Sequence, residues 1–181
     1  MLKGRRLSVP ERGVRPTSDR TREAIFDILG PPAVAGACVL DLYAGTGALG
    51  IEALSRGAER ADFVEGGPDV ARRIEENLRR FGLEARGTVH RADLSGAALP
   101  SGLPGPWRLV FLDPPYEGDE GARWVDAIAA AGVLDPGGVL VYERRNGAPA
   151  PQPPALILTS DRAYGETAVA FYRTAGPVGR P

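Results

Sequence analysis

Hydrophobic and polar positions along the chain predict strands and helices in alternation. Short apolar runs bounded by Gly or Pro are typical of buried strands, and apolar positions three and four residues apart are typical of amphipathic helices. A first helix is expected after Pro16-Thr17-Ser18-Asp19, capped by Thr17 or Ser18 and ended by Pro31-Pro32. The remaining pattern predicts strands at 37–42, 61–65, 88–91, 109–112, 138–143, 156–159 and 167–172, and helices at 48–55, 68–81 and 120–131.

Strands that alternate with helices form a mostly parallel sheet with helices on both faces. The pattern therefore predicts a single α/β domain over residues 19–181, preceded by a basic arm at residues 1–18. The proline- and glycine-rich stretches at 94–106 and 148–154 are expected to be loops within this domain. In such a sheet, ligands bind at the carboxyl ends of the strands near the switch in strand order. The residues that end each strand are therefore the candidates for function.

Composition excludes several kinds of site. The chain has 181 residues, with one cysteine, Cys38, and one histidine, His90, so we expect neither an internal disulfide nor a zinc site, and no metal. No apolar run approaches the roughly 18 residues of a membrane helix, and the first ten residues lack the apolar core of a signal peptide. We expect a cytoplasmic protein with no membrane partner. His90 is expected to be an ordinary strand residue, Cys38 a small apolar filler in a buried strand, and Trp107 and Trp124 to serve packing.

Charge is distributed unevenly along the chain. The formal net charge is −1, which by itself argues against a nucleic-acid partner. However, residues 1–22 carry seven basic and two acidic side chains, a net +5, and the rest carries fifteen basic and twenty-one acidic ones, a net −6. This asymmetry indicates a basic arm on an acidic body.

A glycine motif follows the first predicted strand. Gly45-x-Gly47-x-x-Gly50 lets the backbone approach a ligand closely, and Glu65, twenty residues after Gly45, stands where an acid that binds ribose is expected. These features alone predict a nucleoside-bearing cofactor without choosing between a nicotinamide dinucleotide and S-adenosylmethionine. Asp41 favours the latter, because a carboxylate there would attract a cationic methionine group and repel a pyrophosphate. Asp93, after the third strand, can accept a hydrogen bond from the adenine amino group.

The fourth strand ends in Asp113-Pro114-Pro115-Tyr116. The two prolines make the backbone rigid, and the Asp113 carboxylate and the Pro114 carbonyl can accept hydrogen bonds from one planar amino group. Tyr116 offers a ring on which a base can stack. An exocyclic amine is a poor nucleophile, and acceptors on both of its N–H bonds increase its electron density and orient it toward a methyl donor. The string therefore predicts methylation of an exocyclic amine.

Together these motifs resemble the class I S-adenosylmethionine-dependent amino-methyltransferases, and three segments resemble the RsmD family. The segments are the Arg15-Pro16-Thr17 to Phe26 stretch, LDLYAGTGALGIEALSRGA at 40–58 and VFLDPPY at 110–116. Near the C-terminus, Tyr164 to Thr167 and Phe171-Tyr172 also fit. Thr46 stands where serine is common, Tyr43 where phenylalanine is common, and Gly66-Gly67-Pro68 is unusual.

The resemblance implies a Rossmann-like class I methyltransferase fold with a seven-stranded sheet and helices on both faces. It also implies an enzyme that transfers a methyl group from S-adenosyl-L-methionine to the N2 amine of a guanine in 16S ribosomal RNA. Such an enzyme is expected to act as a monomer on an assembling small subunit. The implied sites are Asp113, Pro114, Pro115 and Tyr116 at the target base, Asp41, Tyr43, Ala44, Gly45, Thr46, Gly47, Glu65 and Asp93 at the cofactor, and Arg5, Arg6, Arg12, Arg15, Arg20 and Arg22 at RNA phosphates.

Other functions stay open at this point. An adenine-N6 methyltransferase acting on DNA or RNA uses a related string, although the chain has no room for a DNA-recognition domain. A glutamine methyltransferase also uses one, but usually with Asn in place of Asp113. A NAD-dependent oxidoreductase would account for the glycines only, and a non-catalytic RNA-binding assembly protein would account for the arm only. Arg20 and Arg22 lie on the first predicted helix, where one of them can instead pair with Asp19 or Glu23.

Overall fold

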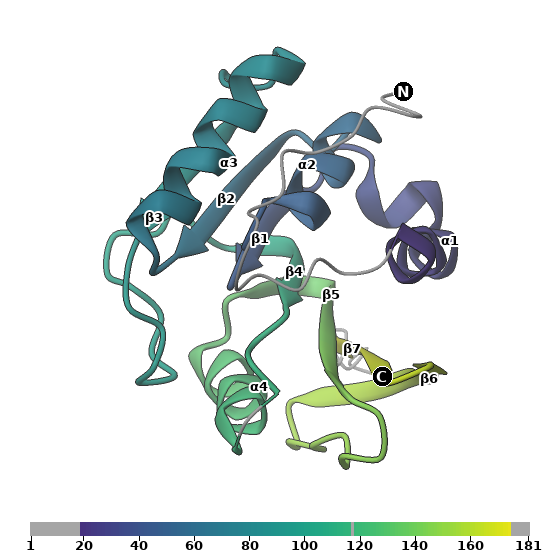
Figure 1. Ribbon diagram of the computed structural model, residues 1–181. Coiled ribbons are helices and arrows are strands. Elements are labelled where there is room, and N and C mark those ends of the chain that lie inside the picture. The colour runs from purple at the N-terminus through teal and green to yellow at the C-terminus, as the bar shows by residue number, and fades with distance from the viewer. Residues whose placement is uncertain (1–18, 117, 175–181) are drawn as a thin grey trace.

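The computed structural model describes residues 19–116 and 118–174. These residues form one seven-stranded sheet flanked by four helices (Figure 1). The predicted arm at 1–18, with Arg5, Arg6, Arg12 and Arg15, lies outside the described residues. The elements are α1 (Asp19–Val34), β1 (Cys38–Leu42), α2 (Ala48–Ser55), β2 (Arg60–Glu65), α3 (Pro68–Phe81), β3 (Gly87–Arg91), β4 (Trp107–Leu112), α4 (Glu120–Ala131), β5 (Leu134–Arg145), β6 (Leu156–Tyr164) and β7 (Thr167–Thr174).

The strand order is β3-β2-β1-β4-β5-β7-β6. The first five strands in this order are parallel, whereas β7 pairs antiparallel with both β5 and β6. This is the expected mostly parallel sheet, and its order reverses between β1 and β4. Leu42 lies beside Val64 on one side and Leu112 on the other, so β1, β2 and β4 end at the same level. A crevice at the switch point is therefore bordered by the ends of these three strands.

Two apolar layers cover the faces of the sheet. One joins buried side chains of α1, α2 and α3, such as Ile25, Leu54 and Ile74, to the α1 side of the sheet. The other joins Trp124 and Ile128 of α4 to the opposite face, and partly buried side chains of the 92–106 loop pack against it. Trp107 and Trp124 are both buried, which confirms that they serve packing.

Helix α1 differs from the prediction at its C-terminal end. Gly30, with φ 66° and ψ 165°, interrupts the helix one residue before Pro31-Pro32. The two prolines were expected to end the helix, but they lie in the first turn of the helical segment that follows the kink. Proline is compatible with that position because the first turn of a helix does not use its own N–H groups.

Two findings concern the described residues as a set. No helix among them is long and apolar enough to cross a membrane. Within 19–116 and 118–174, no three His, Cys, Asp or Glu side chains gather in a way that could hold a metal ion.

Candidate active site at the carboxyl ends of the central strands

Asp41 lies buried at the end of β1, and its side chain is 2 % exposed. Its Oδ2 accepts a hydrogen bond of 2.9 Å from the backbone N–H of Gly50, the third residue of α2. The N-cap of α2 is Gly47, which has no side chain to cap the helix, so Asp41 supplies the acceptor from outside. A Cβ on Gly50 would stand 2.3 Å from the Phe63 ring and 3.1 Å from Asp41 Oδ2, so only glycine fits there.

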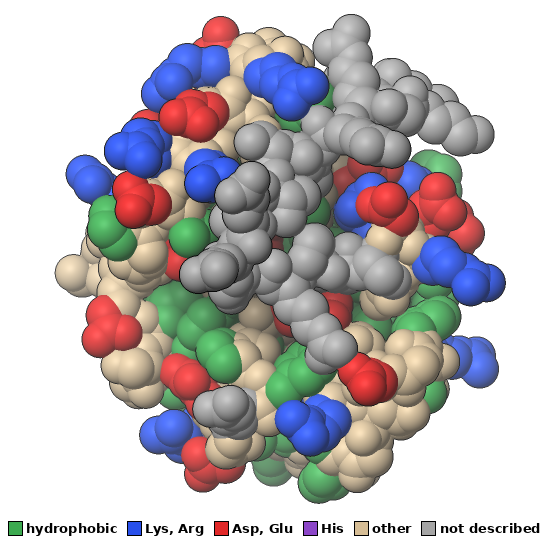
Figure 2. Space-filling view, viewed as in Figure 1, with side chains coloured by type: hydrophobic (Ala, Val, Ile, Leu, Met, Phe, Trp, Pro, Cys, Tyr) green, Lys and Arg blue, Asp and Glu red, His purple; other side chains and the backbone are tan. Residues whose placement is uncertain are grey.

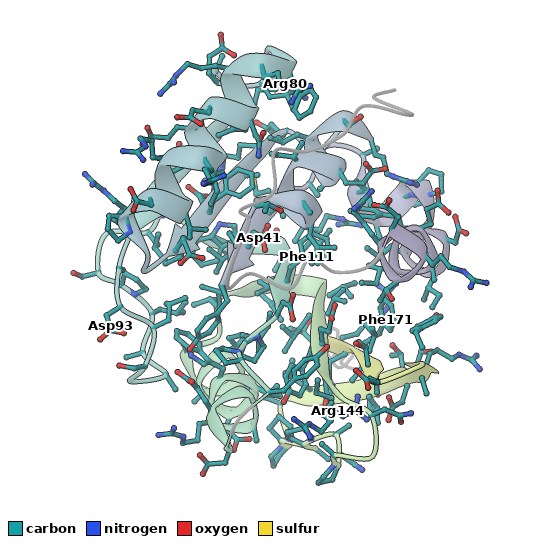
Figure 3. All side chains as sticks on the ribbon, viewed as in Figure 1. Asp41, Arg80, Asp93, Phe111, Arg144 and Phe171 are labelled. Atoms are coloured by element: carbon teal, nitrogen blue, oxygen red, sulfur yellow. The ribbon has the colours of Figure 1, made fainter. Side chains whose placement is uncertain are left out.

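Burial also changes the acidity of Asp41. Loss of hydration raises the pKa of this carboxyl to about 7; the Gly50 N–H opposes the rise and the Glu65 charge adds to it. Near neutral pH the side chain is therefore balanced between its neutral and ionised forms. A cationic group brought close to it would favour the ionised form. In Figure 3, Asp41 lies near the centre of the molecule, close in the view to Phe111 of β4.

Glu65, at the end of β2, joins two loops through its carboxylate. Oε2 accepts the Gly45 N–H at 3.0 Å and Oε1 accepts the Gly67 N–H at 2.8 Å. A carboxylate offers about four acceptor positions, so each oxygen keeps one for a further donor such as a ribose hydroxyl. Gly45 and Gly47 both have positive φ, 54° and 77°, which the tight turn between β1 and α2 requires.

Tyr43 has an unusual backbone for a residue with a side chain, with φ 56°. Its hydroxyl lies 2.6 Å from Glu120 Oε1 and 2.9 Å from the Leu94 carbonyl oxygen, the two acceptors available to its proton. The same hydroxyl accepts the Trp124 indole N–H at 2.9 Å. Burial and the Glu120 carboxylate raise the pKa of Tyr43. The turn after β1 is thereby joined to the loop after β3 and to the start of α4.

The remaining residues expected at the cofactor lie in two places. Ala44 and Thr46 are buried within the turn after β1, and the Thr46 carbonyl accepts a 3.2 Å hydrogen bond from the Asn77 amide. Asp93 is exposed, and its two oxygens accept the backbone N–H and the hydroxyl of Ser95 at 3.0 and 2.9 Å. These bonds lower the pKa of Asp93. In Figure 3, Asp93 lies at the edge of the molecule, away from Asp41.

The Asp113-Pro114-Pro115-Tyr116 loop lies beside the turn after β1. The backbone N–H of Asp113 is 3.4 Å from the Leu42 carbonyl oxygen, which continues the pairing of β4 with β1. Pro114 is buried and Pro115 is exposed. The Tyr116 hydroxyl is held 2.9 Å from Glu143 Oε1 and 2.7 Å from Thr167 Oγ1. The expectation that the Tyr116 ring stacks on a base stays a prediction, with the hydroxyl end of that ring anchored to β5 and β7.

Sequence reasoning missed the side chains that hold these motifs in place. Glu143 is buried on β5, Glu120 begins α4, and Thr167 begins β7. Each acts on a residue 27 to 77 positions away in the chain, so no local pattern indicates the contact. The only signal in the sequence for any of these contacts is Glu143 itself, an acid that interrupts the apolar run of β5.

A second buried acid, Asp62, forms a separate cluster. Its carboxylate contacts Arg60 at 2.8 Å, the Trp107 indole N–H at 3.0 Å and the His90 ring at 3.0 Å. His90 is thus a strand residue in a structural polar cluster. Arg60 also donates to the Cys38 sulfur at 3.2 Å. Cys38 is only partly buried and has this polar neighbour, so it is more than an apolar filler.

Of the arginines expected at RNA, two lie among the described residues. Arg20 is exposed at the start of α1, whereas Arg22 forms a 2.9 Å ion pair with Asp19. The expected alternative pairing with Asp19 is thus confirmed for Arg22. On the face shown in Figure 2, described arginine side chains are interspersed with acidic ones around the rim.

The fold and the strand-end motifs define a class I methyltransferase. Residues 1–173 match the family described as "Conserved hypothetical protein 95", and the chain belongs to that family. It is 36 % identical over 178 residues to "Putative rRNA methyltransferase YlbH" of Bacillus subtilis, with 96 % of each chain covered. It is 30 % identical to "Ribosomal RNA small subunit methyltransferase D" of Haemophilus influenzae over 176 residues, covering 96 % of this chain and 90 % of that one.

A solved structure shares the architecture. "Putative methyltransferase yhhF from Escherichia coli" superposes with a TM-score of 0.82 at 31 % identity, covering 96 % of this chain and 93 % of that chain. The sequence-based fold class and the resemblance to the RsmD family are thus confirmed. A methyltransferase family accounts for both the glycine motif and the Asp113 string, which the oxidoreductase and the non-catalytic alternatives do not.

Proposed function

We propose that the protein transfers the methyl group of S-adenosyl-L-methionine to the N2 amine of a guanine in 16S ribosomal RNA. The observation that carries the proposal is the position of the Asp113-Pro114-Pro115-Tyr116 loop. It lies against the turn after β1, with Asp113 bonded to the last residue of that strand. An amine held by this loop therefore lies next to the place where the family fold holds a methyl donor.

The residues around the crevice suit that donor. Carboxylates at the ends of β1 and β2 match the ammonium and ribose hydroxyls of S-adenosyl-L-methionine, and like charges would disfavour a pyrophosphate there. Glu65 would bind the ribose hydroxyls, Asp41 would lie near the cationic methionine part, and Asp93 would lie near adenine. The bound donor supplies a methyl group on a sulfonium, which the amine attacks in line.

The chain itself orients the acceptor. The Asp113 carboxylate and the Pro114 carbonyl would each accept one N–H of the guanine amine. The amine then presents its nitrogen to the methyl group, and the Asp113 carboxylate lies next to the proton that becomes acidic as the new bond forms. The buried surroundings of Pro114 keep water from competing for these acceptors. No strong base is needed before the methyl transfer begins.

The RNA partner is proposed from the family and from charge. Relatives named as rRNA methyltransferases support ribosomal RNA as the substrate. The basic residues at 1–22 would contact phosphates, with Arg20 exposed at the start of α1. We further propose that the protein acts as a monomer in the cytoplasm, on a small subunit that is still assembling.

The test is a transfer assay with donor labelled on the methyl group. Deproteinised 16S RNA, assembling small-subunit particles and DNA, each lacking the modification, are offered separately, and the products are digested to nucleosides. We expect label in N2-methylguanosine from the particles. Label in N6-methyladenosine, or in DNA alone, would overturn the guanine assignment. Asp113→Ala should abolish transfer while donor affinity changes less than threefold; a large loss of affinity would show that Asp113 belongs to the donor site instead.

A further inference from the structure

A second carboxylate lies level with Asp113 at the edge of the sheet. Leu112 pairs with Tyr142 across the parallel strands β4 and β5, so Asp113, directly after β4, follows level with Glu143 of β5. Such strands lie about 4.8 Å apart. The Tyr116 hydroxyl lies 2.9 Å from Glu143 Oε1, and its pKa is raised by burial and also by the charges of Glu143 and Asp113.

Glu143 is 5 % exposed, and its direction is set by the Asp113-Pro114-Pro115-Tyr116 loop, called the target-base loop below. Its Oε1 accepts the Tyr116 hydroxyl at 2.9 Å, and the same hydroxyl lies 2.7 Å from Thr167 Oγ1. The run of strand residues before it, Val139 to Tyr142, is apolar and buried. A carboxylate buried at the end of such a strand costs stability, and an apolar residue would pack there more cheaply. The Glu143 carboxylate is therefore a buried charge that lies directly beside this loop.

The chemistry of the bases shows what such a group can distinguish. The Watson–Crick edge of guanine presents an N1–H beside the N2 amine, so this part of the base carries three N–H bonds, of which the N1–H and the nearer amine N–H are parallel. Asp113 and Pro114 can accept the two of the amine, which leaves the N1–H in need of an acceptor. Adenine presents a lone pair at N1 beside its amine, and a carboxylate facing that lone pair would be repelled and left without a hydrogen bond.

We propose that Glu143 is the residue that selects guanine, by accepting the N1–H while Asp113 and Pro114 hold the N2 amine. This inference rests on the proposed function and assigns its base specificity. Tyr116 is then a positioning residue as well as a platform, because its hydroxyl fixes the Glu143 carboxylate. The two acids have separate tasks: Asp113 orients the nucleophile, and Glu143 recognises the neighbouring atom.

The experiment replaces guanine by 2-aminopurine, which keeps the 2-amino group, has a lone pair in place of the N1–H and lacks the 6-oxygen. The test is therefore the change in preference caused by a substitution at Glu143, which acts on the N1 difference. Once the transfer assay has mapped the target, 16S RNA with either base at that position is ligated from fragments and assembled into particles. We expect the wild-type enzyme to prefer guanine by about ten-thousand-fold in kcat/KM, as sites built to bind an N–H reject analogues without it.

Glu143→Gln is the matched variant, because the amide has the same shape and can donate to the lone pair of 2-aminopurine. For this variant we expect kcat/KM on guanine to fall about a hundredfold or more and kcat/KM on 2-aminopurine to rise. The two values should then lie within about tenfold of each other, because recognition of the N1–H is lost. Glu84→Gln, an exposed acid after α3, should leave both rates unchanged. Donor affinity and the unfolding midpoint of each variant are measured alongside.

The outcomes are distinct. A wild-type enzyme that labels no guanine overturns the proposed function itself. Guanine labelling with an unchanged preference in Glu143→Gln overturns the role of Glu143 and leaves the function intact. An equal loss on both bases would show that Glu143 only supports the structure, and it overturns the inference too. A shift of preference toward 2-aminopurine, with donor affinity retained, supports it.

Discussion

At the scale of single residues, Asp41 makes binding of the donor depend on pH. Its pKa in the protein is about 7, raised by burial, so below that pH the side chain is mainly neutral. A cationic donor stabilises the ionised form, so binding must release a proton at lower pH. We expect the affinity for S-adenosyl-L-methionine to rise as the pH increases through about 7. Calorimetric titrations between pH 5.5 and 8.5, in buffers of different ionisation enthalpy, measure both the affinity and the proton released.

The control for this prediction is Asp41→Asn, which keeps an oxygen able to accept the Gly50 N–H. Its affinity for the donor should be lower at high pH and nearly independent of pH. The raised pKa of Asp41 also affects the free energy of unfolding. Between pH 3.8 and about 7 this carboxyl is ionised in the unfolded chain and neutral in the folded one, so the free energy of unfolding falls as the pH rises. Relative to the variant, the wild-type protein should lose stability across that window. Equal pH slopes in the two proteins would contradict the role of Asp41.

Tyr43 connects the turn after β1, here called the donor turn, to α4 through one hydroxyl group. Tyr43→Phe removes the group that accepts the Trp124 N–H and that lies 2.6 Å from Glu120, and it keeps the edge-to-face contact between the Tyr43 and Trp124 rings. The Trp124 N–H retains the Leu94 carbonyl at 3.0 Å, so the loss should be modest, about 1 kcal/mol in the free energy of unfolding. Urea unfolding measures it. A loss above about 3 kcal/mol would mean that the hydroxyl carries more than these bonds.

At the scale of elements, the start of α4 packs so closely on the target-base loop that only glycine fits. A Cβ on Gly121 would lie 2.4 Å from the Tyr142 hydroxyl and 2.9 Å from Pro114 Cγ. Gly121→Ala must therefore displace the Tyr142 ring, Pro114 or α4, at about 1–3 kcal/mol of stability. We expect kcat to fall more than tenfold and donor affinity to fall much less, because Pro114 packs directly on Gly121, whereas the turn after β1 reaches α4 only through the Tyr43 hydroxyl. Steady-state kinetics and donor titration separate the two effects.

Gly96→Ala is the control for that experiment, since a Cβ on Gly96 would meet nothing within 4 Å. It should change neither stability nor rate. If Gly121→Ala weakened donor binding as much as turnover, α4 would have to position both loops, and the separation between them would be wrong.

The elements also show which parts of the fold could be predicted. Helices α2, α3 and α4 begin and end at the predicted residues, because glycines mark the end of each and Pro68 marks the start of α3. Strand β6 was predicted to end at 159 but continues to Tyr164. Residues 160–164, its second half, include no buried side chain and are held by backbone pairing with β7, which does not depend on an apolar pattern. The contacts of Glu143 and Tyr43 join distant strands and helices, and local pattern carries no information about them.

At the scale of the whole molecule, charge divides the chain into a basic arm and an acidic body. The motifs of the donor and target-base loops could be read from sequence because each is a continuous string after a strand. Their relative position could be inferred only from the rule that parallel strands end at one edge, and the structure places them there. The carboxylates of that edge contribute negative charge where RNA must approach. A separate positive element is therefore required to attract phosphates.

The last prediction concerns that element. Replacing Arg5, Arg6 and Arg12 by Gln should weaken binding of 16S RNA and reduce the slope of log Kd against log salt by about 2, since each lost phosphate contact removes about 0.7–0.9. Replacing Arg72, Arg73 and Arg79 of α3 removes the same charge from a helix where Arg72 pairs with Asp69 and Arg79 with Glu75. That control should leave the slope nearly unchanged, because two of its three arginines pair with acids of the same helix. Equal slopes for both variants would show that the protein attracts RNA by its total charge, and the arm would then have no specific part in binding.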